Sequence, residues 1–341
     1  ENDRRQGFLL GAKAENVNTT FDISHSSMYS NLKYTFSKKL ISNFGVRYSY
    51  YTNSYYGTGT TSDENWNQIP IESIDESMNN NLIGFHLSIK YKLNEKSNIY
   101  SAINRGYKAG GINQNPYLDN SQRFFKPEYN LNINGGFSYI SNLCETNINL
   151  FYMKRYSQQV GLYYQLDPNN PLSFTYYTAN AVSGYNSGIE TTLKVIIRDN
   201  ASIIFNSGIL KNHVGKFNDP FNTDIIYGNR EPAHSPTFNY SIAFNYMFKN
   251  GFYITIDNTG MDEFFFDDQA SIKSNPYSIS NISFGYKIIN WNLSIWGKNI
   301  LNEKYTTRGY YFDLGIGQQG DQAYKAYGNP AHFGINLEYT L

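Results

Sequence analysis

The chain has 341 residues and a balanced charge, with 28 Lys plus Arg against 28 Asp plus Glu. Its length suits one large domain or two ordinary ones, and the neutral balance gives no electrostatic case for a nucleic-acid partner. No run of eighteen apolar residues occurs, which excludes transmembrane helices. Cys144 is the single cysteine, which excludes an internal disulfide and disfavours a cysteine-based metal site.

Aromatic residues are abundant, with 32 Tyr and 23 Phe. Two girdles of aromatic side chains at membrane interfaces would account for them, and a Tyr-rich soluble β protein is the alternative. The first residues, from Glu1, lack the charged and apolar regions of a signal peptide. We therefore expect that a leader was removed or that the sequence does not begin where the gene does.

Alternation of apolar and polar residues with period two predicts fourteen β-strands. They are expected near residues 8–16, 27–37, 40–52, 81–93, 97–107, 128–140, 144–160, 174–197, 201–213, 236–249, 252–262, 277–289, 292–305 and 331–341. Charged residues such as Lys90 and Glu190 fall on the polar face of these strands. A dry core disfavours charges there, whereas a water-filled lumen accepts them.

The connections between these strands alternate between short and long from residue 27 onward. Short connections are expected at 37–39, 94–96, 141–143, 199–200, 249–251 and 290–291. Long connections are expected at 53–80, 108–127, 161–173, 214–235, 263–276 and 306–330. An up-and-down membrane barrel with tight periplasmic turns and long extracellular loops has this asymmetry. A soluble binding module with all its long loops at one end is the alternative.

The last strand, 331–341, shows the alternation most clearly, with Phe333, Ile335 and Leu337 on one face. Eleven strand residues span roughly 36 Å, which at a tilt of about 45° covers the apolar height of an outer-membrane barrel. An even strand number returns the chain to its starting side, so this strand is expected to run down to the periplasm.

Five segments carry motifs that occur in the same order in one known family. The most specific is RGYKAGGIN at 105–113, followed by FKPE at 125–128. The others are NAVSGYNSGIE at 180–190, GNREPAHSP at 228–236, GKNILNEKY at 297–305 and, before the last strand, YGNPAHFG at 327–334. Together they resemble the C-terminal half of TonB-dependent outer-membrane receptors, including the siderophore and iron-complex receptors.

The resemblance implies a 22-stranded barrel around an N-terminal plug domain, and transport energised by an inner-membrane TonB–ExbB–ExbD complex. This chain has room for about fourteen strands, shows no plug or TonB box, and ends at Leu341 rather than at the family's usual aromatic residue. We therefore interpret residues 1–341 as the C-terminal portion of a longer receptor barrel, an all-β, multi-pass protein of the Gram-negative outer membrane. In that case the plug and the early strands are missing from the chain.

An open sheet edge in lipid leaves unpaired backbone groups, each of which costs several kcal/mol. Strand 331–341 must therefore pair with strand 8–16, which would close a fourteen-stranded barrel, or with strands outside the chain. The first option predicts a complete passive channel with a water-filled pore. The second, which we favour, predicts the receptor fragment.

Catalysis and cofactor binding find little support in the sequence. The five histidines lack metal-ligand spacing; they are His25, His86, His213, His234 and His332. We expect no enzyme, no cofactor and no metal site of this kind. An acidic segment at 262–268 surrounds three phenylalanines. Its carboxylates suit Ca²⁺, but the calcium-loop pattern is absent, so we favour a solvated loop with an aromatic tip.

A ligand site is expected where the strands meet the long loops. Cations there could attract an anionic ferric chelate, and Tyr rings could stack on planar or sugar groups. The candidate residues are Arg105, Tyr107, Lys108, Arg123, Arg230, His234, Arg308, Tyr310 and Tyr311. The competing interpretation is an interfacial girdle that contacts lipid and lipopolysaccharide.

We therefore expect a receptor and transporter for TonB-dependent uptake of a scarce nutrient, typically a ferric siderophore. Its expected partners are outer-membrane lipid and lipopolysaccharide, the TonB complex acting through a plug outside the chain, and the small-molecule ligand. The passive channel and the soluble binding module remain as alternatives.

Overall fold

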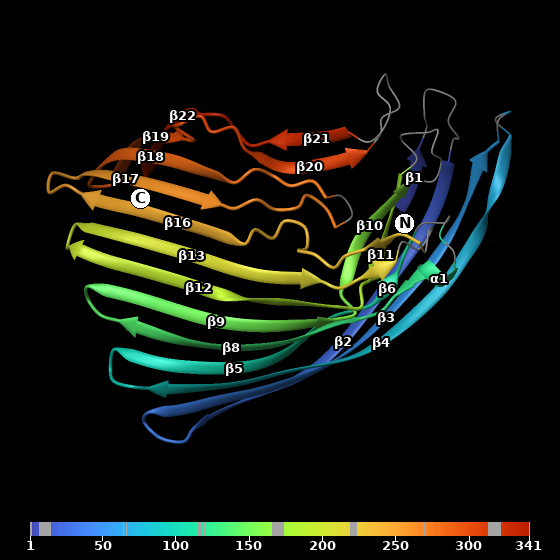
Figure 1. Ribbon diagram of the computed structural model, residues 1–341, viewed down its shortest axis with the longest axis horizontal. Coiled ribbons are helices and arrows are strands. Elements are labelled where there is room, and N and C mark those ends of the chain that lie inside the picture. Colours follow the sequence, from blue (N-terminus) through green and yellow to red (C-terminus); the bar gives the residue numbers. More distant parts are fainter. Residues whose placement is uncertain are drawn as a thin grey trace.

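The computed structural model describes residues 2–6, 15–63, 65, 67–114, 118, 120–165, 174–218, 224–268, 271–312 and 322–340. Most of them belong to one curved sheet of fourteen strands (Figure 1). Every neighbouring pair in this sheet is antiparallel, and the strands follow one another in sequence order. This is the up-and-down topology predicted from the alternation of short and long connections.

The sheet strands are, in order, β1 (Asn2–Gln6), β2 (Glu15–Thr35), β3 (Leu40–Ser62), β4 (Gln68–Lys92), β5 (Ser97–Lys108), β8 (Glu128–Ile140), β9 (Cys144–Tyr156), β12 (Ser183–Arg198), β13 (Ala201–Val214), β16 (Phe238–Met247), β17 (Phe252–Met261), β18 (Tyr277–Ile288), β19 (Trp291–Lys298) and β22 (His332–Tyr339). Thirteen of the fourteen predicted strands overlap a sheet strand of the matching rank. The exception is 8–16, because residues 7–14 lie outside the described part and residues 15–16 open β2.

Three predicted strands are too long at their loop ends. The expected strand 292–305 ends at Lys298, and the other two break into a separate hairpin. The expected strand 144–160 ends at Tyr156, and the expected strand 174–197 is interrupted after Asn180. The residues beyond those points form a separate hairpin of β10 (Gln159–Gln165) and β11 (Phe174–Asn180). The alternation continues through the break because the hairpin is itself β-structure.

The prediction of a long loop at 53–80 is wrong. β3 continues to Ser62 and β4 begins at Gln68, so this segment forms a tall hairpin rising above the sheet. The tall hairpin pairs with β2 as far as Asn16. Its Tyr55 packs in one cluster with Ile112 of the loop after β5, and the two residues are 1% and 4% exposed. A Cβ added at Gly59 would lie 2.3 Å from the Asn16 carbonyl oxygen, so glycine permits the close approach of the two strands.

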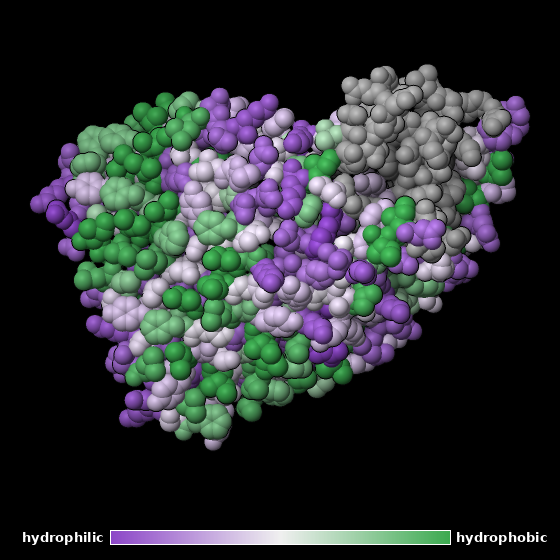
Figure 2. Space-filling model, in the orientation of Figure 1, coloured by the Kyte–Doolittle hydropathy of each residue, from purple (hydrophilic) through white to green (hydrophobic). Residues whose placement is uncertain are grey.

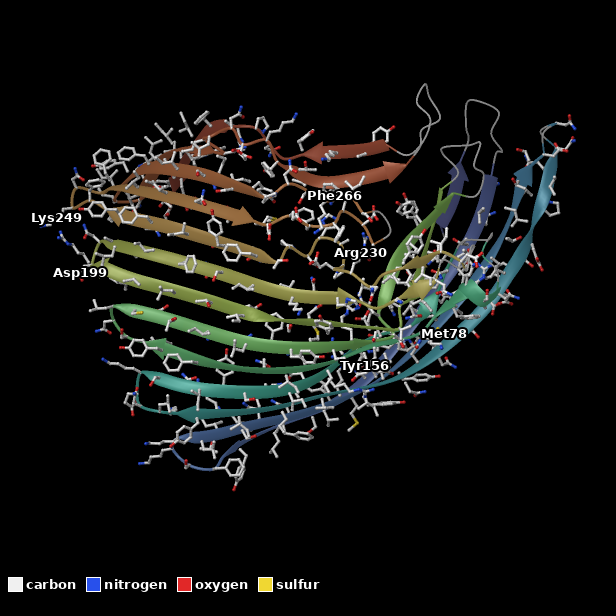
Figure 3. All side chains as sticks on the ribbon, viewed as in Figure 1. Met78, Tyr156, Asp199, Arg230, Lys249 and Phe266 are labelled. Atoms are coloured by element: carbon white, nitrogen blue, oxygen red, sulfur yellow. The ribbon has the colours of Figure 1, made fainter. Side chains whose placement is uncertain are left out.

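All the short turns lie at one end of the sheet and the long loops at the other. Asp199 and Lys249 mark the short-turn end in Figure 3, and Arg230 and Phe266 mark the long-loop end. The last strand runs to the short-turn end, where Tyr339 pairs with Trp291. The last strand therefore ends on the side of the short turns, as the predicted alternation of short and long connections requires.

The two faces of the sheet differ in chemistry. On the outer face, apolar side chains remain exposed, as in β22, where Phe333, Ile335 and Leu337 are 70%, 72% and 62% exposed. Figure 2 shows hydrophobic side chains gathered over the short-turn half of the visible face. A soluble protein rarely exposes so large an apolar area, whereas lipid would cover it.

The inner face is polar and rich in asparagine. Asn104 on β5 accepts from or donates to His86 on β4, and Asn134 on β8 donates to Asn149 on β9. Asn149 in turn donates to Glu190 on β12 at 3.1 Å. These amides line an open hollow of about 510 Å³ on the wall.

The principal buried hydrophobic cluster of the described residues lies among the long loops rather than in the sheet. It contains Leu118, Val160, Leu162, Tyr177, Ala181, Val214 and Phe217. The loop elements around it are β6 (Gly111–Ile112), α1 (Asn120–Arg123), β7 (Phe124–Phe125), β14 (Phe217–Asn218) and β15 (Ile226–Tyr227), and a further hairpin comprises β20 (Thr306–Phe312) and β21 (Gln322–Tyr327). The loops therefore form a packed layer above the sheet.

The two edges of the sheet are β1 and β22, and within the described part of the chain each has one strand partner. The strand pairing that would close a fourteen-stranded barrel is therefore absent from these residues. Among the same residues, no helix has the length and apolar character needed to cross a membrane.

Replacement of Ile256 by Lys tests the assignment of the faces. Ile256 lies on the outer face between Phe244 and Ile282, whereas the neighbouring Thr255 faces inward beside Asn245. We expect Ile256→Lys to lower the free energy of unfolding in phospholipid vesicles by about 2–4 kcal/mol, because a cation at mid-depth meets lipid. Thr255→Lys, the control, should cost less than about 1 kcal/mol. Equal losses would contradict the assignment.

Candidate functional site

The ligand residues predicted from the sequence fall into three groups at the long-loop end. Arg105, Tyr107, Lys108 and Arg123 belong to β5 and the loop that follows it, beside the tall hairpin. Arg230 and His234 belong to the loop before β16. The remaining three candidates, Arg308, Tyr310 and Tyr311, belong to β20.

Arg123 supports the loop layer from inside. Its side chain is 4% exposed, and its guanidinium donates to the carbonyls of Asn113 at 3.2 Å and Leu118 at 2.7 Å. Burial lowers the pKa of Arg123 from its usual value, while nearby Tyr55 and Glu76 oppose that shift. Because its donors are directed at the chain's own carbonyls, Arg123 acts as a framework residue in this structure.

Asn113 joins two of the loops through its side-chain amide. Its amide nitrogen donates to the carbonyls of Gln122 at 2.7 Å and Thr178 at 2.9 Å, and its oxygen accepts from the Thr178 backbone N–H at 2.8 Å. One buried side chain therefore ties the RGYKAGGIN segment to the β10–β11 hairpin. Asn113 was not among the predicted site residues, although it closes that motif.

Tyr107 and Arg105 are both engaged at the base of the tall hairpin. The Tyr107 hydroxyl lies 2.6 Å from the Ser49 hydroxyl. Arg105 donates to the Ile83 carbonyl at 2.8 Å and lies 4.4 Å from the centre of the Tyr129 ring. Lys108, at the end of β5, is exposed.

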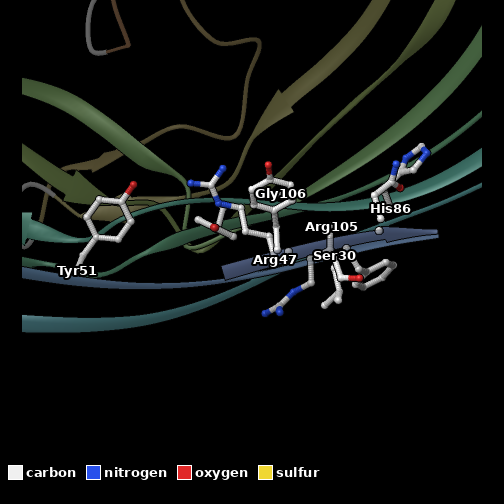
Figure 4. A pocket seen from close by; sticks show the side chains of 13 residues that line it. Ser30, Arg47, Tyr51, His86, Arg105 and Gly106 are labelled. Atoms are coloured by element: carbon white, nitrogen blue, oxygen red, sulfur yellow. The ribbon is translucent and has the colours of Figure 1, made fainter. Parts of the chain in front are cut away.

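Arg105 faces outward rather than into the barrel. In the ladder it pairs with Phe85 and Leu131, both on the apolar face. An open hollow of about 610 Å³ lies here, and in Figure 4 Tyr51 and His86 rise on one side of the strands while Arg105 points to the other. The predicted group of β5 residues therefore does not converge on one lumenal site.

Arg230 belongs to a compact arrangement that we call the rim clamp, defined as Arg230, Glu231, Glu263, Phe265 and Lys273. The Arg230 guanidinium and the Lys273 ammonium lie 4.3 Å and 4.5 Å from the centre of the same Phe265 ring. Lys273 also pairs with Glu263 at 3.0 Å and with Glu231 at 3.5 Å. The rim clamp thus joins the loop before β16 to the loop before β18.

Charge stabilises the rim clamp at neutral pH. Burial lowers the pKa of Arg230, and Asp267 and Asp268 oppose that shift. The hydrogen bond to Glu263 is the main cause that raises the pKa of Lys273. Because the folded lysine holds its proton more tightly, its ion pairs stabilise the loops at neutral pH and are lost as the pH rises through that raised pKa.

His234 and Arg308 lie around the same loop. The backbone N–H of His234 donates to the Phe265 carbonyl at 2.9 Å, and its exposed ring lies 5.2 Å from that of Phe264. A Cβ added at Gly309 would lie 2.3 Å from the Phe266 ring, so β20 packs directly on this loop. The adjacent Arg308 is exposed. Tyr310 and Tyr311 are part of β20, but their side chains lie outside the described part.

The interpretation of 264–266 as a solvated aromatic tip is wrong. Phe264 and Phe266 are each 6% exposed and meet edge to face at 5.8 Å, so they form the base of the loop. The acidic side chains are used internally, since Asp268 accepts from the Ala233 N–H and Glu263 pairs with Lys273. Within the described ranges, no three His, Cys, Asp or Glu side chains form a group that could hold a metal ion.

The sequence reasoning did not identify Phe265 and Lys273 as partners of Arg230. Their positions in the chain carry no signal of the contact, because the two loops are brought together by the ladder between β16 and β17. It also did not identify the ion pair of Glu128 and Arg155, which joins β8 to β9 at 2.7 Å. For this pair the sequence did carry a signal, because Glu128 closes the FKPE motif. In the structure Glu128 is 6% exposed, and its other carboxylate oxygen accepts from the Gln159 N–H.

Several solved receptors and transporters share this fold. The ferric yersiniabactin uptake receptor FyuA from Yersinia pestis superposes with a TM-score of 0.76 at 19% identity, covering 96% of this chain and 47% of FyuA. The siderophore receptor PiuA from Acinetobacter baumannii gives 0.69 at 15% identity, covering 96% and 44%. The copper transporter OprC gives 0.72 at 11% identity, covering 96% and 50%.

The chain spans about half the length of these proteins, and at such identities the likeness shows the fold alone. The family model for the TonB dependent receptor-like β-barrel matches residues 2–300. That family lies in the outer membrane of Gram-negative bacteria, which agrees with the exposed apolar face and the all-β architecture. The chain belongs to the TonB-dependent receptor β-barrel family.

Proposed function

We propose that the chain forms the C-terminal part of the barrel of an outer-membrane receptor that imports an iron complex, with a ferric siderophore as the expected cargo. The observation that carries this proposal is the exposure of two cations at the long-loop end, Lys108 and Arg308. His234, four residues after Arg230 of the rim clamp, is also exposed. Cations in this position attract anionic chelates. FyuA, a ferric yersiniabactin uptake receptor, and PiuA, a siderophore receptor, share the fold, as does the copper transporter OprC.

The energy for uptake comes from the TonB–ExbB–ExbD complex, acting through a plug and early strands supplied by the remainder of a longer protein. The edges at β1 and β22 support this, because lipid does not tolerate unpaired backbone groups. We assign the protein no enzymatic role. The mass of the native protein tests the assignment of residues 1–341 to a larger barrel, and a value near 39.2 kDa with no larger precursor would contradict it.

The passive channel is not favoured, since the described β1 and β22 do not pair. Growth tests separate the two functions. Expressed in an iron-starved host without siderophore receptors of its own, the receptor should restore growth on at least one ferric chelate, and only when TonB is present. Steady ion conductance of the purified protein in planar bilayers, without TonB, would favour the channel instead.

Loss of the exposed cations Lys108 and Arg308 should weaken ligand capture. For the double variant Lys108→Gln/Arg308→Gln, we expect the dissociation constant of the active ferric chelate to rise about three- to tenfold, and added salt to bring the wild type towards the same value. Binding is measured by fluorescence quenching. The control, Lys39→Gln/Lys249→Gln, removes two exposed cations at the short-turn end and should leave binding unchanged.

Loss of Arg123 should loosen the loop layer instead. Arg123→Met leaves the carbonyls of Asn113 and Leu118 without this donor, at a cost of about 1–3 kcal/mol. Hydrogen exchange should therefore accelerate at 109–114 and 174–180, while the strands of the sheet keep their protection. Lys108→Met is the matched control, and unchanged exchange in Arg123→Met would rule out the framework role.

A further inference from the structure

One stretch of β4 lacks a strand neighbour on one side. β3 pairs with β4 from Gln68 to Tyr91, whereas β5 pairs with it only from Phe85 downward. Within the described residues, 68–84 therefore has a strand partner on one side alone, and its other side presents a row of backbone N–H and C=O groups. In Figure 1 this part of β4 rises at the right-hand border of the view.

Both ends of this edge are closed. At the lower end the Ile83 carbonyl accepts from the Arg105 guanidinium at 2.8 Å. At the upper end Pro70 has no N–H to donate, and the register with β3 shifts just below it. Prolines, lysines and bulges are devices that prevent unwanted strand pairing. The stretch between the two ends, 74–81, contains no proline, no lysine and no register shift, and we call it the open edge.

The open edge lies above the apolar band of the sheet. Below it the outward side chains of β4 are apolar, and Ile83, Leu87 and Ile89 are 49%, 39% and 48% exposed. Above them the outward side chains become polar and exposed. They are Asp75, Ser77, Asn79 and Asn81. Water rather than lipid therefore surrounds the open edge, so its backbone groups are hydrated and accessible to a partner.

The inward face of the same stretch is already packed. Ile74 is 9% exposed in a cluster with Tyr55 and Ile112. Asn80 is 3% exposed and donates to the Gly110 carbonyl at 3.4 Å. This packing holds the strand in its extended conformation, which lowers the conformational entropy that a partner would have to overcome on pairing.

The charge around the open edge is acidic. Residues 48–84, which contain the tall hairpin, include five carboxylates and no Lys, Arg or His. Glu72 and Asp75 are exposed, and neither forms a salt bridge within the part of the chain that the structure describes. Like charges disfavour pairing with the same edge of a second copy, whereas a strand that carries Lys or Arg is attracted. The charge therefore selects a cationic partner.

We propose that the open edge binds an extended, Lys- or Arg-rich segment of a partner polypeptide outside the cell, which adds to β4 as a further strand. The eight residues of 74–81 offer a ladder of roughly 26 Å. Main-chain hydrogen bonds supply the attachment, and cross-strand contacts with Asp75 and Ser77 favour cationic and small polar side chains. The open edge has the opposite charge to Lys108 and Arg308, so this role goes beyond the capture of a chelate.

Binding of a defined peptide to the full-length receptor in an uncharged detergent tests the proposal. The probe is a labelled nonapeptide of alternating Thr and Lys, and binding is followed by fluorescence anisotropy. The same peptide methylated at every backbone nitrogen keeps its charge but cannot donate to the open edge. We expect the methylated peptide to bind at least about tenfold more weakly, and a nonapeptide of alternating Thr and Glu to bind more weakly still.

Two further measurements locate the site. Glu72→Gln/Asp75→Asn should weaken binding of the Thr–Lys peptide about three- to tenfold. The matched control Glu95→Gln/Asp199→Asn removes two exposed carboxylates at the short-turn end and should leave binding unchanged. In the wild type, the peptide should slow hydrogen exchange at 74–81, because backbone N–H groups there become paired, and leave exchange in β16 to β19 unchanged.

The outcomes distinguish strand addition from its alternatives. If the methylated peptide binds as tightly as the Thr–Lys peptide, charge alone holds it and the proposal is overturned. Protection outside 74–81, or an equal loss of affinity in the control variant, has the same consequence. A dimer trapped by oxidation of Ser77→Cys/Cys144→Ser without peptide would assign the open edge to a second copy instead. Because the readout is peptide binding, failure of the uptake proposal would leave this result interpretable.

Discussion

The pairing of backbone groups along the antiparallel ladder is the constraint on which the rest of this structure depends. Lipid offers no hydrogen bonds, so each strand must satisfy its backbone groups through its neighbours. The ladder in turn fixes which side chains share a face. The exposed apolar face and the asparagine-rich wall both follow from a register that places Ile335 outward and Asn336 inward.

A second level of organisation lies above the sheet. The loops form their own hydrophobic cluster, and buried polar groups such as Asn113 and Arg123 join them. Ligand capture by such a surface depends on few exposed residues, because most polar groups there are already committed to the loops themselves. This explains why the cationic candidates fall into two kinds. Lys108 and Arg308 are exposed, whereas Arg123 and Arg230 hold the loops together.

Sequence patterns predicted the sheet well because period-two alternation and short turns are local signals. They missed the tall hairpin, whose glycines resemble a loop and whose inner face is buried by the contact of Tyr55 with a distant segment. Alternation alone already places Arg105 with Ile99 and Ile103 on the apolar face, so its outward direction was available from sequence. The burial of Arg123 and the rim clamp were not, because both arise from contacts between loops far apart in the chain.

The asparagine wall has a consequence for anything that moves along the inside of the barrel. A carboxamide donates and accepts equally well, so a passing polar surface can exchange one hydrogen bond for another at nearly constant free energy. A wall of paired charges would instead hold an occupant in one register and respond to salt. Asn104, Asn132 and Asn149 therefore give this part of the wall donors and acceptors that different polar occupants can use.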